Sequence, residues 1–308
     1  MGSVFQFDWE VDLIISLQEL ISQFPFLKHV FVLFTYFGEP VFGALIVAVL
    51  YFSNKKEWGR YVILSALTCQ VVTDMIKNLV FRIRPYIVNE SIECLKPVEP
   101  NEDIYDPIKQ GFSFPSAHVT FASSLATGIG LKSGKPKYSL FLLPLVILVA
   151  ISRFSLGVHY PGDVIAGALI GLAGVFLFDL LYRKAERKRA YLLLAALCVP
   201  GMAFCISEDY FAVCGLLMGF MCGDLYQERY VRFEDTDDLA QIGMRLLGAA
   251  AVFLGFTELL KVASGFLTYG SRPYLLYRTF RYGISTFMAF GVYPYSFAWM
   301  AKIRKKQL

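Results

Sequence analysis

Three polar segments of this chain bring charged side chains and histidines next to long apolar stretches. They run from Lys77 to Pro85, from Phe114 to His118 and from Ser152 to Asp163. Among their residues are the cations Lys77, Arg84 and Arg153 and two of the chain's three histidines, His118 and His159. Charges close to a membrane are costly, so cations that cluster there predict an anionic partner.

The cations and the donors beside them suit a phosphate group. A guanidinium pairs with phosphate oxygens through two parallel hydrogen bonds, and a lysine adds a point charge. Ser116 and the backbone N–H groups that open the next apolar stretch can donate further hydrogen bonds, helped by the positive end of a helix dipole. These features predict a cradle for a phosphoryl group.

The two histidines can supply the chemistry of phosphoryl transfer. Such a reaction needs a nucleophile, a proton donor for the leaving group and stabilisation of charge on the phosphoryl oxygens. Asp163 follows His159 by four residues, so its carboxylate can hold one ring nitrogen while the other attacks phosphorus. His118 can then protonate the leaving oxygen and later activate water.

The apolar stretches predict membrane-spanning helices as the scaffold of these segments. Hydrophobic residues make up 56% of the 308 residues and charged ones 18%, against about 25% charged residues in soluble proteins. The excess falls in blocks of about 17–25 residues, the length at which a helix crosses a bilayer. Apolar and polar residues alternate at helical spacing over residues 8–24, which predicts an amphipathic helix at the membrane surface. Nine spans are expected, at 26–52, 59–81, 116–131, 138–157, 162–182, 190–206, 210–226, 241–262 and 278–301. The first of them is expected to be kinked at Gly38-Glu39-Pro40.

Lysine and arginine alternate between the connections and predict the orientation of the chain. The connections after the first, third, fifth and seventh spans are basic, as is the C-terminus. The N-terminus, the 82–115 loop and the 158–161 turn are poor in lysine and arginine. Cytoplasmic loops carry the excess of these residues. The N-terminus and all three polar segments are therefore expected on the non-cytoplasmic side, and the C-terminus in the cytoplasm.

Charge and cysteine content argue against several classes of protein. A formal net charge of +4 is too small to indicate nucleic-acid binding. The six cysteines are scattered without a CxxC pair, so neither a zinc site nor a disulfide framework is indicated. No metal and no cofactor is expected, and the oligomeric state stays open.

In chain order, the three segments fit the patterns KxxxxxxRP, PSxH and SRxxxxxHxxxD. These patterns resemble the signature of the type 2 phosphatidic acid phosphatase superfamily over about residues 60–182. The resemblance implies a metal-independent phosphatase with a helical core like that of acid phosphatases and haloperoxidases. It makes His159 the nucleophile that forms a phosphohistidine, with Asp163 as its orienting partner. It also implies phosphate-binding or catalytic roles for Lys77, Arg84, Ser116, His118 and Arg153.

Two further positions are assigned beside the motifs. Ala117 stands where the family usually has glycine, and its backbone N–H is expected to keep the contact with a phosphoryl oxygen. Asp74 lies one turn before Lys77 on the same helix face. It either orients that lysine or is a plain buried polar residue.

The chain is expected to divide into an interfacial helix (1–25), a phosphatase core of five spans with the 82–115 outer loop (26–182) and a four-helix membrane extension (183–308). The leading hypothesis is a lipid phosphatase, with the bilayer and a lipid phosphate monoester or diphosphate as its partners. The layout is also similar to that of glucose-6-phosphatases and sphingosine-1-phosphate phosphatases. Hydrolysis of a soluble sugar phosphate is therefore an alternative, as is a lipid transporter or scaffold that kept a phosphate site.

Overall fold

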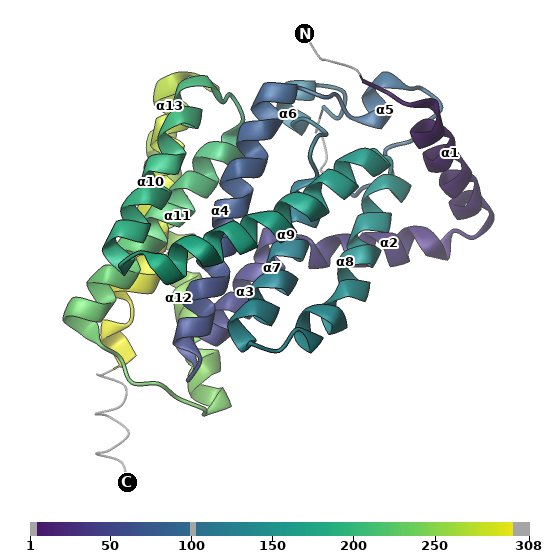
Figure 1. Ribbon diagram of the computed structural model, residues 1–308. Coiled ribbons are helices and arrows are strands. Elements are labelled where there is room, and N and C mark those ends of the chain that lie inside the picture. Colours follow the sequence, from purple (N-terminus) through teal and green to yellow (C-terminus); the bar gives the residue numbers. More distant parts are fainter. Residues whose placement is uncertain (1–4, 99–102, 298–308) are drawn as a thin grey trace. The chain divides into compact units, whose positions relative to one another are not determined.

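The computed structural model describes residues 5–98 and 103–297, and within these ranges every regular element is a helix (Figure 1). The predicted all-helical class is confirmed. The chain forms two compact units, one of Met1–Ala44 and Thr68–Lys184, the other of Leu45–Leu67 and Ala185–Leu308. Helices α3 (Pro40–Phe52) and α4 (Lys56–Val80) contribute residues to both units. All three polar segments belong to the first unit.

The remaining helices of the first unit are α1 (Asp8–Gln23), α2 (Phe26–Phe37), α5 (Pro85–Val88), α6 (Pro107–Gln110), α7 (Ala117–Ser133), α8 (Lys137–Ser155) and α9 (Pro161–Lys184). Proline opens α5, α6 and α9, where its missing N–H leaves no helical hydrogen bond unmade. Helix α7 packs against α8 and α9, and α2 packs against α8. The backbone N–H of Ser116 donates to the carbonyl of Asp163 (2.9 Å), so the beginnings of α7 and α9 lie side by side.

The break between α2 and α3 confirms the predicted kink. The two helices are bent by 46° across Gly38 and Glu39, and Pro40 opens α3. A Cβ atom at Gly38 would lie 2.7 Å from Val149 Cγ1 and 3.0 Å from the Cβ of His118. Only glycine lets the broken helix approach α7 and α8 this closely.

The predicted N-terminal amphipathic helix is present as α1. It buries Glu10, Val11, Ile14 and Ile21 against the first unit. Trp9 lies on the opposite side of α1, with 54% of its surface exposed. The placement of α1 at the membrane surface stays a prediction.

Four described helical stretches are long and apolar enough to cross a membrane, and the bent α2–α3 pair would make a fifth. The four are Lys56–Val88, Lys137–Ser155, Pro161–Lys184 and Leu239–Ser264. The other four predicted spans coincide with α7 and with three helices of the second unit. These four helices do not meet this criterion of length and composition. The end of the last predicted span lies outside the described residues. The nine-span layout therefore stays a prediction.

The second unit contains α10 (Arg187–Phe204), α11 (Glu208–Tyr226), the π-helix η1 (Gln227–Val231), α12 (Leu239–Ser264), α13 (Arg272–Phe287) and η2 (Met288–Val292). Its buried Asp224 accepts hydrogen bonds from Nε of Arg60 (2.8 Å) and from the hydroxyls of Tyr51 (3.0 Å) and Tyr191 (2.8 Å). A carboxylate buried among apolar helices needs such partners. This network ties the first turns of α4 to α10 and α11.

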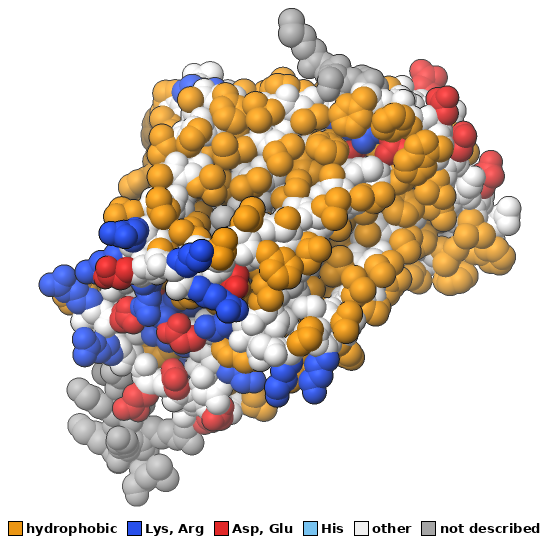
Figure 2. Space-filling model, viewed as in Figure 1, with side chains coloured by type: hydrophobic (Ala, Val, Ile, Leu, Met, Phe, Trp, Pro, Cys, Tyr) orange, Lys and Arg blue, Asp and Glu red, His pale blue; other side chains and the backbone are white. Residues whose placement is uncertain are grey.

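The outward surface of the first unit is that of a membrane protein. Side chains of α8 and α9 such as Phe141 (80% exposed) and Leu177 (68% exposed) point away from the unit. Figure 2 shows hydrophobic side chains over α8 and α9, and basic ones at the turn between α7 and α8. Within this unit, α5 and α6 lie at the end remote from that basic turn (Figure 1).

Candidate active site

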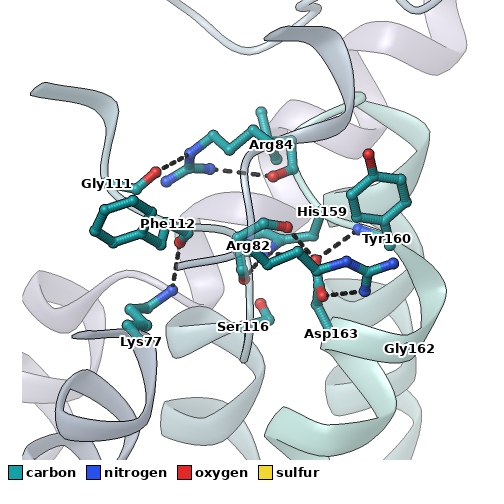
Figure 3. A network of polar contacts seen from close by, with 12 residues as sticks. Lys77, Arg82, Arg84, Gly111, Phe112, Ser116, His159, Tyr160, Gly162 and Asp163 are labelled. Atoms are coloured by element: carbon teal, nitrogen blue, oxygen red, sulfur yellow. Dashed lines mark hydrogen bonds and ion pairs between the residues drawn. The ribbon is translucent and has the colours of Figure 1, made fainter. Parts of the chain in front are cut away.

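His159 lies in the tight turn between α8 and α9, with only 2% of its surface exposed (Figure 3). The turn contains Gly157 at a φ of 76°, a backbone conformation that favours glycine. A side chain at this position would also overlap the carbonyl oxygen of Glu93. Turn geometry and close packing thus fix the position of the imidazole.

Hydrogen bonding assigns the proton on the His159 ring. Its Nδ1 lies 2.8 Å from the carbonyl oxygen of Ser113, which can only accept a hydrogen bond. Nδ1 therefore carries the proton in the neutral imidazole, and Nε2 keeps the lone pair. Oδ2 of Asp163 lies 3.6 Å from the same Nδ1. The ring is held in the tautomer in which Nε2 can act as a nucleophile.

The carboxylate of Asp163 binds both the residue that follows His159 and the segment that contains Ser113. Its Oδ2 accepts hydrogen bonds from the backbone N–H of Tyr160 (2.8 Å) and from the hydroxyl of Ser113. Its Oδ1 accepts one from Nη1 of Arg82 (2.6 Å). The predicted partner of His159 thus lies beside it, while the backbone of Ser113 makes the direct hydrogen bond.

Carbonyl oxygens orient two of the predicted cations. The guanidinium of Arg84 donates to the carbonyls of Gln110 (2.7 Å from Nη2) and Val158 (3.2 Å from Nη1). Nζ of Lys77 donates to the carbonyl of Phe112 (2.8 Å), as Figure 3 shows. These neutral carbonyls therefore fix the directions of the two cationic side chains.

Electrostatics places the predicted residues around one imidazole. The pKa of His159 is held well below its ordinary value, first by burial and then by positive charge. The groups that supply this charge are, in order of effect, Arg84, Lys77, Arg153 and His118. Residues of all three polar segments therefore lie close enough to His159 to act on its charge.

Several buried donors of this region make no hydrogen bond with any described residue. Among them are the hydroxyl of Ser116, which precedes α7 but does not cap it, and Nε of Arg153. Arg153 is nonetheless held by its Nη1, 3.4 Å from the hydroxyl of Thr35. Leaving a buried donor unpaired is unfavourable, so such donors are typical of a ligand site.

The second histidine has a carboxylate partner. Nε2 of His118 lies 2.9 Å from Oε1 of Glu39, which sits in the break between α2 and α3. An ionised carboxylate at this distance stabilises a proton on the imidazole. Glu39 lies far from the three motifs in sequence, and only the bend of the broken helix brings it here.

The remaining predicted positions also lie in this region. Ala117 is the first residue of α7, and its carbonyl accepts a hydrogen bond from the side chain of Gln70 (2.9 Å). Asp74 is buried on α4, one turn before Lys77, and its predicted role stays a prediction. In the described part of the chain, no group of three or more His, Cys, Asp or Glu side chains is arranged to hold a metal ion.

Sequence reasoning missed four residues that contact the site. Ser113 directly precedes the second segment, and Arg82 lies within the first, where the run of basic residues is its signal. Glu10 stands in the N-terminal helix and Glu39 in the break between α2 and α3, where an acidic residue is most simply explained by exposure. No local pattern distinguishes such a residue from a solvated one.

Comparison with known proteins gives the family of this chain. The model of the PAP2 superfamily matches residues 58–187, and that of the PAP2 superfamily phosphatase, transmembrane extension, matches residues 211–306. The lipid A 4'-phosphatase of Bacteroides thetaiotaomicron is 30% identical over 172 residues, which cover 52% of this chain and 72% of that protein. The decaprenylphosphoryl-5-phosphoribose phosphatase of Mycobacterium tuberculosis is 30% identical over 171 residues, covering 53% and 84%. Phosphatidylglycerophosphatase B of Bacillus subtilis is 26% identical over 191 residues, covering 57% and 85%.

Apolar helices that carry a buried, cation-surrounded histidine define a class of membrane phosphatases. This chain belongs to the PAP2 superfamily of membrane phosphatases and carries that superfamily's transmembrane extension. It is an integral membrane protein with several helical spans. No solved structure gives a significant match, and the likeness of the core to haloperoxidases stays a prediction.

Proposed function

We propose that this protein hydrolyses a lipid phosphate monoester or diphosphate, without a metal or cofactor, through a phosphohistidine on His159. The observation that carries the proposal is the tautomer of this residue. Its Nδ1 is held by the carbonyl of Ser113 at 2.8 Å, which leaves the lone pair on Nε2, and cations surround the ring.

In the first step, Nε2 of His159 attacks phosphorus and the bond from phosphorus to the leaving oxygen breaks. The guanidinium groups of Arg84 and Arg153, with Nζ of Lys77, stabilise the charge that spreads over the phosphoryl oxygens. The hydroxyl of Ser116 and the N–H of Ala117 at the start of α7 add two donors. His118 gives its proton to the leaving oxygen.

In the second step, His118 takes a proton from water, and the oxygen of that water attacks phosphorus. The bond from phosphorus to Nε2 breaks, inorganic phosphate leaves and His159 returns to its starting state. Glu39, 2.9 Å from Nε2 of His118, stabilises the proton that this residue passes back and forth. Asp163 favours the positive charge that builds on the His159 ring. Asp74, one turn before Lys77 on α4, is proposed to support that lysine.

A lipid is the substrate class that the surroundings favour. The apolar faces of α8 and α9 are exposed on the unit that holds the site, so an amphiphile can reach it from the bilayer. The three relatives described above are named for lipid phosphates. A phosphate at headgroup level, beside the beginnings of α7 and α9, would meet the cation cluster.

We further propose the arrangement in the membrane that the basic connections predict. Nine spans would place the N-terminus and the active site on the non-cytoplasmic side and the C-terminus in the cytoplasm. The basic turn between α7 and α8 lies at the end of the first unit remote from α5 and α6, which supports this orientation (Figure 1). Residues 1–25 would form the interfacial helix, 26–182 the phosphatase core and 183–308 the membrane extension.

The test is phosphate release by the purified protein from detergent-solubilised lipid phosphates in the presence of EDTA. We expect activity that vanadate inhibits, because vanadate would occupy the phosphate cradle. His159→Ala should lower the rate by at least about a thousandfold, since the nucleophile is lost. Loss of wild-type activity in EDTA, or a fully active His159→Ala variant, would contradict the proposal.

The same panel separates the alternatives. Release from glucose-6-phosphate but not from lipid phosphates would favour a sugar phosphatase. Movement of an intact lipid between leaflets of reconstituted vesicles, without phosphate release, would favour a transporter.

A further inference from the structure

The Arg82 side chain is one of the most deeply buried cations of the described chain, although it is not among the residues that the three motif patterns specify. It sits two residues before Arg84, with 1% of its surface exposed. Its guanidinium carbon lies 4.3 Å from the ring centre of Phe5 and 3.9 Å from that of Tyr160. Aromatic faces on these two neighbours stabilise a cation that water cannot reach.

Two carboxylates complete the surroundings of Arg82. Nη1 donates to Oδ1 of Asp163 at 2.6 Å, and Nη2 donates to Oε2 of Glu10 at 2.5 Å. Both carboxylates are buried, with at most 1% of either side chain exposed. Figure 3 shows Arg82 reaching toward Asp163 beside the ring of Tyr160. One guanidinium thus joins the carboxylate next to His159 to the N-terminal helix.

Glu10 makes a second contact with the turn that carries the nucleophile. Its Oε1 accepts a hydrogen bond from the backbone N–H of Gly162 at 2.7 Å. Glu10 therefore holds Asp163 through Arg82 and holds the first turn of α9 directly. It comes from α1, outside the 58–187 range that matches the PAP2 superfamily.

We propose that Glu10 and Arg82 are positioning residues of the phosphatase reaction, and that α1 completes the active site by fixing Asp163 and the His159 turn. The inference rests on the proposed function, because it assigns the pair a role in aligning Nε2 of His159 with phosphorus. Asp163 in turn holds the hydroxyl of Ser113, whose carbonyl orients the imidazole. A small displacement of this chain of contacts would misalign the nucleophile.

The first experiment replaces Glu10 by glutamine, which keeps the shape of the side chain and removes its charge. We expect kcat with a lipid phosphate to fall by about 10- to 100-fold while KM stays close to wild type, because the phosphate-binding cations are untouched. Asp12→Asn is the matched control, since it removes a charge from the exposed face of the same helix. It should leave both constants unchanged.

The second experiment displaces Glu10 without changing any charge. A Cβ atom at Gly162 would lie 2.7 Å from Oε1 of Glu10, so Gly162→Ala should push the carboxylate away and lower kcat. Adding Glu10→Asp, whose side chain is one methylene shorter, should restore part of the lost rate. General damage to the fold would not be relieved by a second, shortening substitution.

Rates are expressed per folded molecule, with the folded fraction taken from thermal unfolding of each purified variant. If Glu10→Gln does not fold, Gly162→Ala and its double variant decide the question. Wild-type kcat in the folded single variants would overturn the role of Glu10 and Arg82. An inactive wild type, or an active His159→Ala, would instead overturn the proposed function, so the two failures are distinguishable.

Discussion

At the scale of single residues, different groups orient the imidazole of His159 and the predicted cations. Asp163 pairs with Arg82 and with the hydroxyl of Ser113, on the Nδ1 side of His159. Carbonyl oxygens hold Arg84 and Lys77 in place. The carbonyls therefore fix the directions of the two cations, while the carboxylate supports the imidazole from the Nδ1 side.

The role of His118 predicts a dependence on the leaving group. His118→Asn should slow hydrolysis of an alkyl phosphate by about 10²- to 10⁴-fold, because the departing alkoxide needs a proton. An aryl phosphate with a stable phenolate leaving group should lose far less in its first step. Burst measurements of alcohol or phenol release with the two esters check this. Equal losses for both would contradict general-acid catalysis by His118.

The pKa of His159 predicts the acid limb of the pH profile. Burial and the surrounding cations lower this pKa, against the opposing charge of Asp163 at 3.6 Å, so the imidazole stays neutral as pH falls through its ordinary range. The acid limb of kcat/KM should therefore lie below the ordinary pKa of histidine. Lys77→Met removes a cation, raises the pKa and should move the limb to higher pH.

A control for this shift is Lys109→Met, which removes an exposed lysine of α6. The acid limb of kcat/KM for this variant should coincide with that of the wild type. If Lys77→Met leaves the limb in place, His159 is not the group that the limb reports.

At the scale of elements, glycines set how closely the helices of the site pack. Cβ atoms at Gly167 and Gly171 of α9 would lie 2.6 Å from the carbonyl oxygens of Ser116 and Thr120. In the second unit, Gly215 and Gly219 of α11 face the backbone of α13 in the same way. These small-residue pairs thus serve packing within each unit, as membrane helices commonly use them.

Gly167→Ala is expected to separate the beginnings of α7 and α9. The contact with the backbone of Ser116 cannot relax easily, so we expect destabilisation by about 1–3 kcal/mol and a raised KM as Ser116 moves from the phosphate. Thermal unfolding and steady-state kinetics measure both effects. Gly255→Ala on α12, where no atom lies within 4 Å of the added Cβ, is the control and should be neutral or stabilising. Equal behaviour of the two variants would refute this packing argument.

At the scale of the whole molecule, the distribution of basic side chains predicts the orientation in the membrane. In a background with Cys94 and Cys222 replaced by serine, Glu90→Cys should react with a membrane-impermeant maleimide added outside intact cells. Glu186→Cys should react only after the membrane is opened. Both positions are exposed, so accessibility within the protein does not decide the outcome. The reverse pattern would place the active site in the cytoplasm.

The sequence by itself determined the helices and the class of this protein, a membrane phosphatase of lipid phosphates. Apolar blocks longer than a buried soluble helix predict membrane helices whatever their neighbours, and the break at Glu39 follows from the proline after it. The three motifs are enough to predict a nucleophile, an acid and the cations, because these residues cluster locally along the chain. Such signals are short-range, so they can be read without a fold.

Only the tertiary structure decided which carboxylates and carbonyls form hydrogen bonds or ion pairs with those residues. Glu10 and Gly162 are 152 positions apart, and Glu39 and His118 are 79 apart. Whether an acid is solvated or buried beside a catalytic group depends on helix packing over such separations. The hydrogen bond from His159 to the backbone of Ser113 was equally hidden, because a carbonyl group is present at every residue and leaves no trace in the sequence.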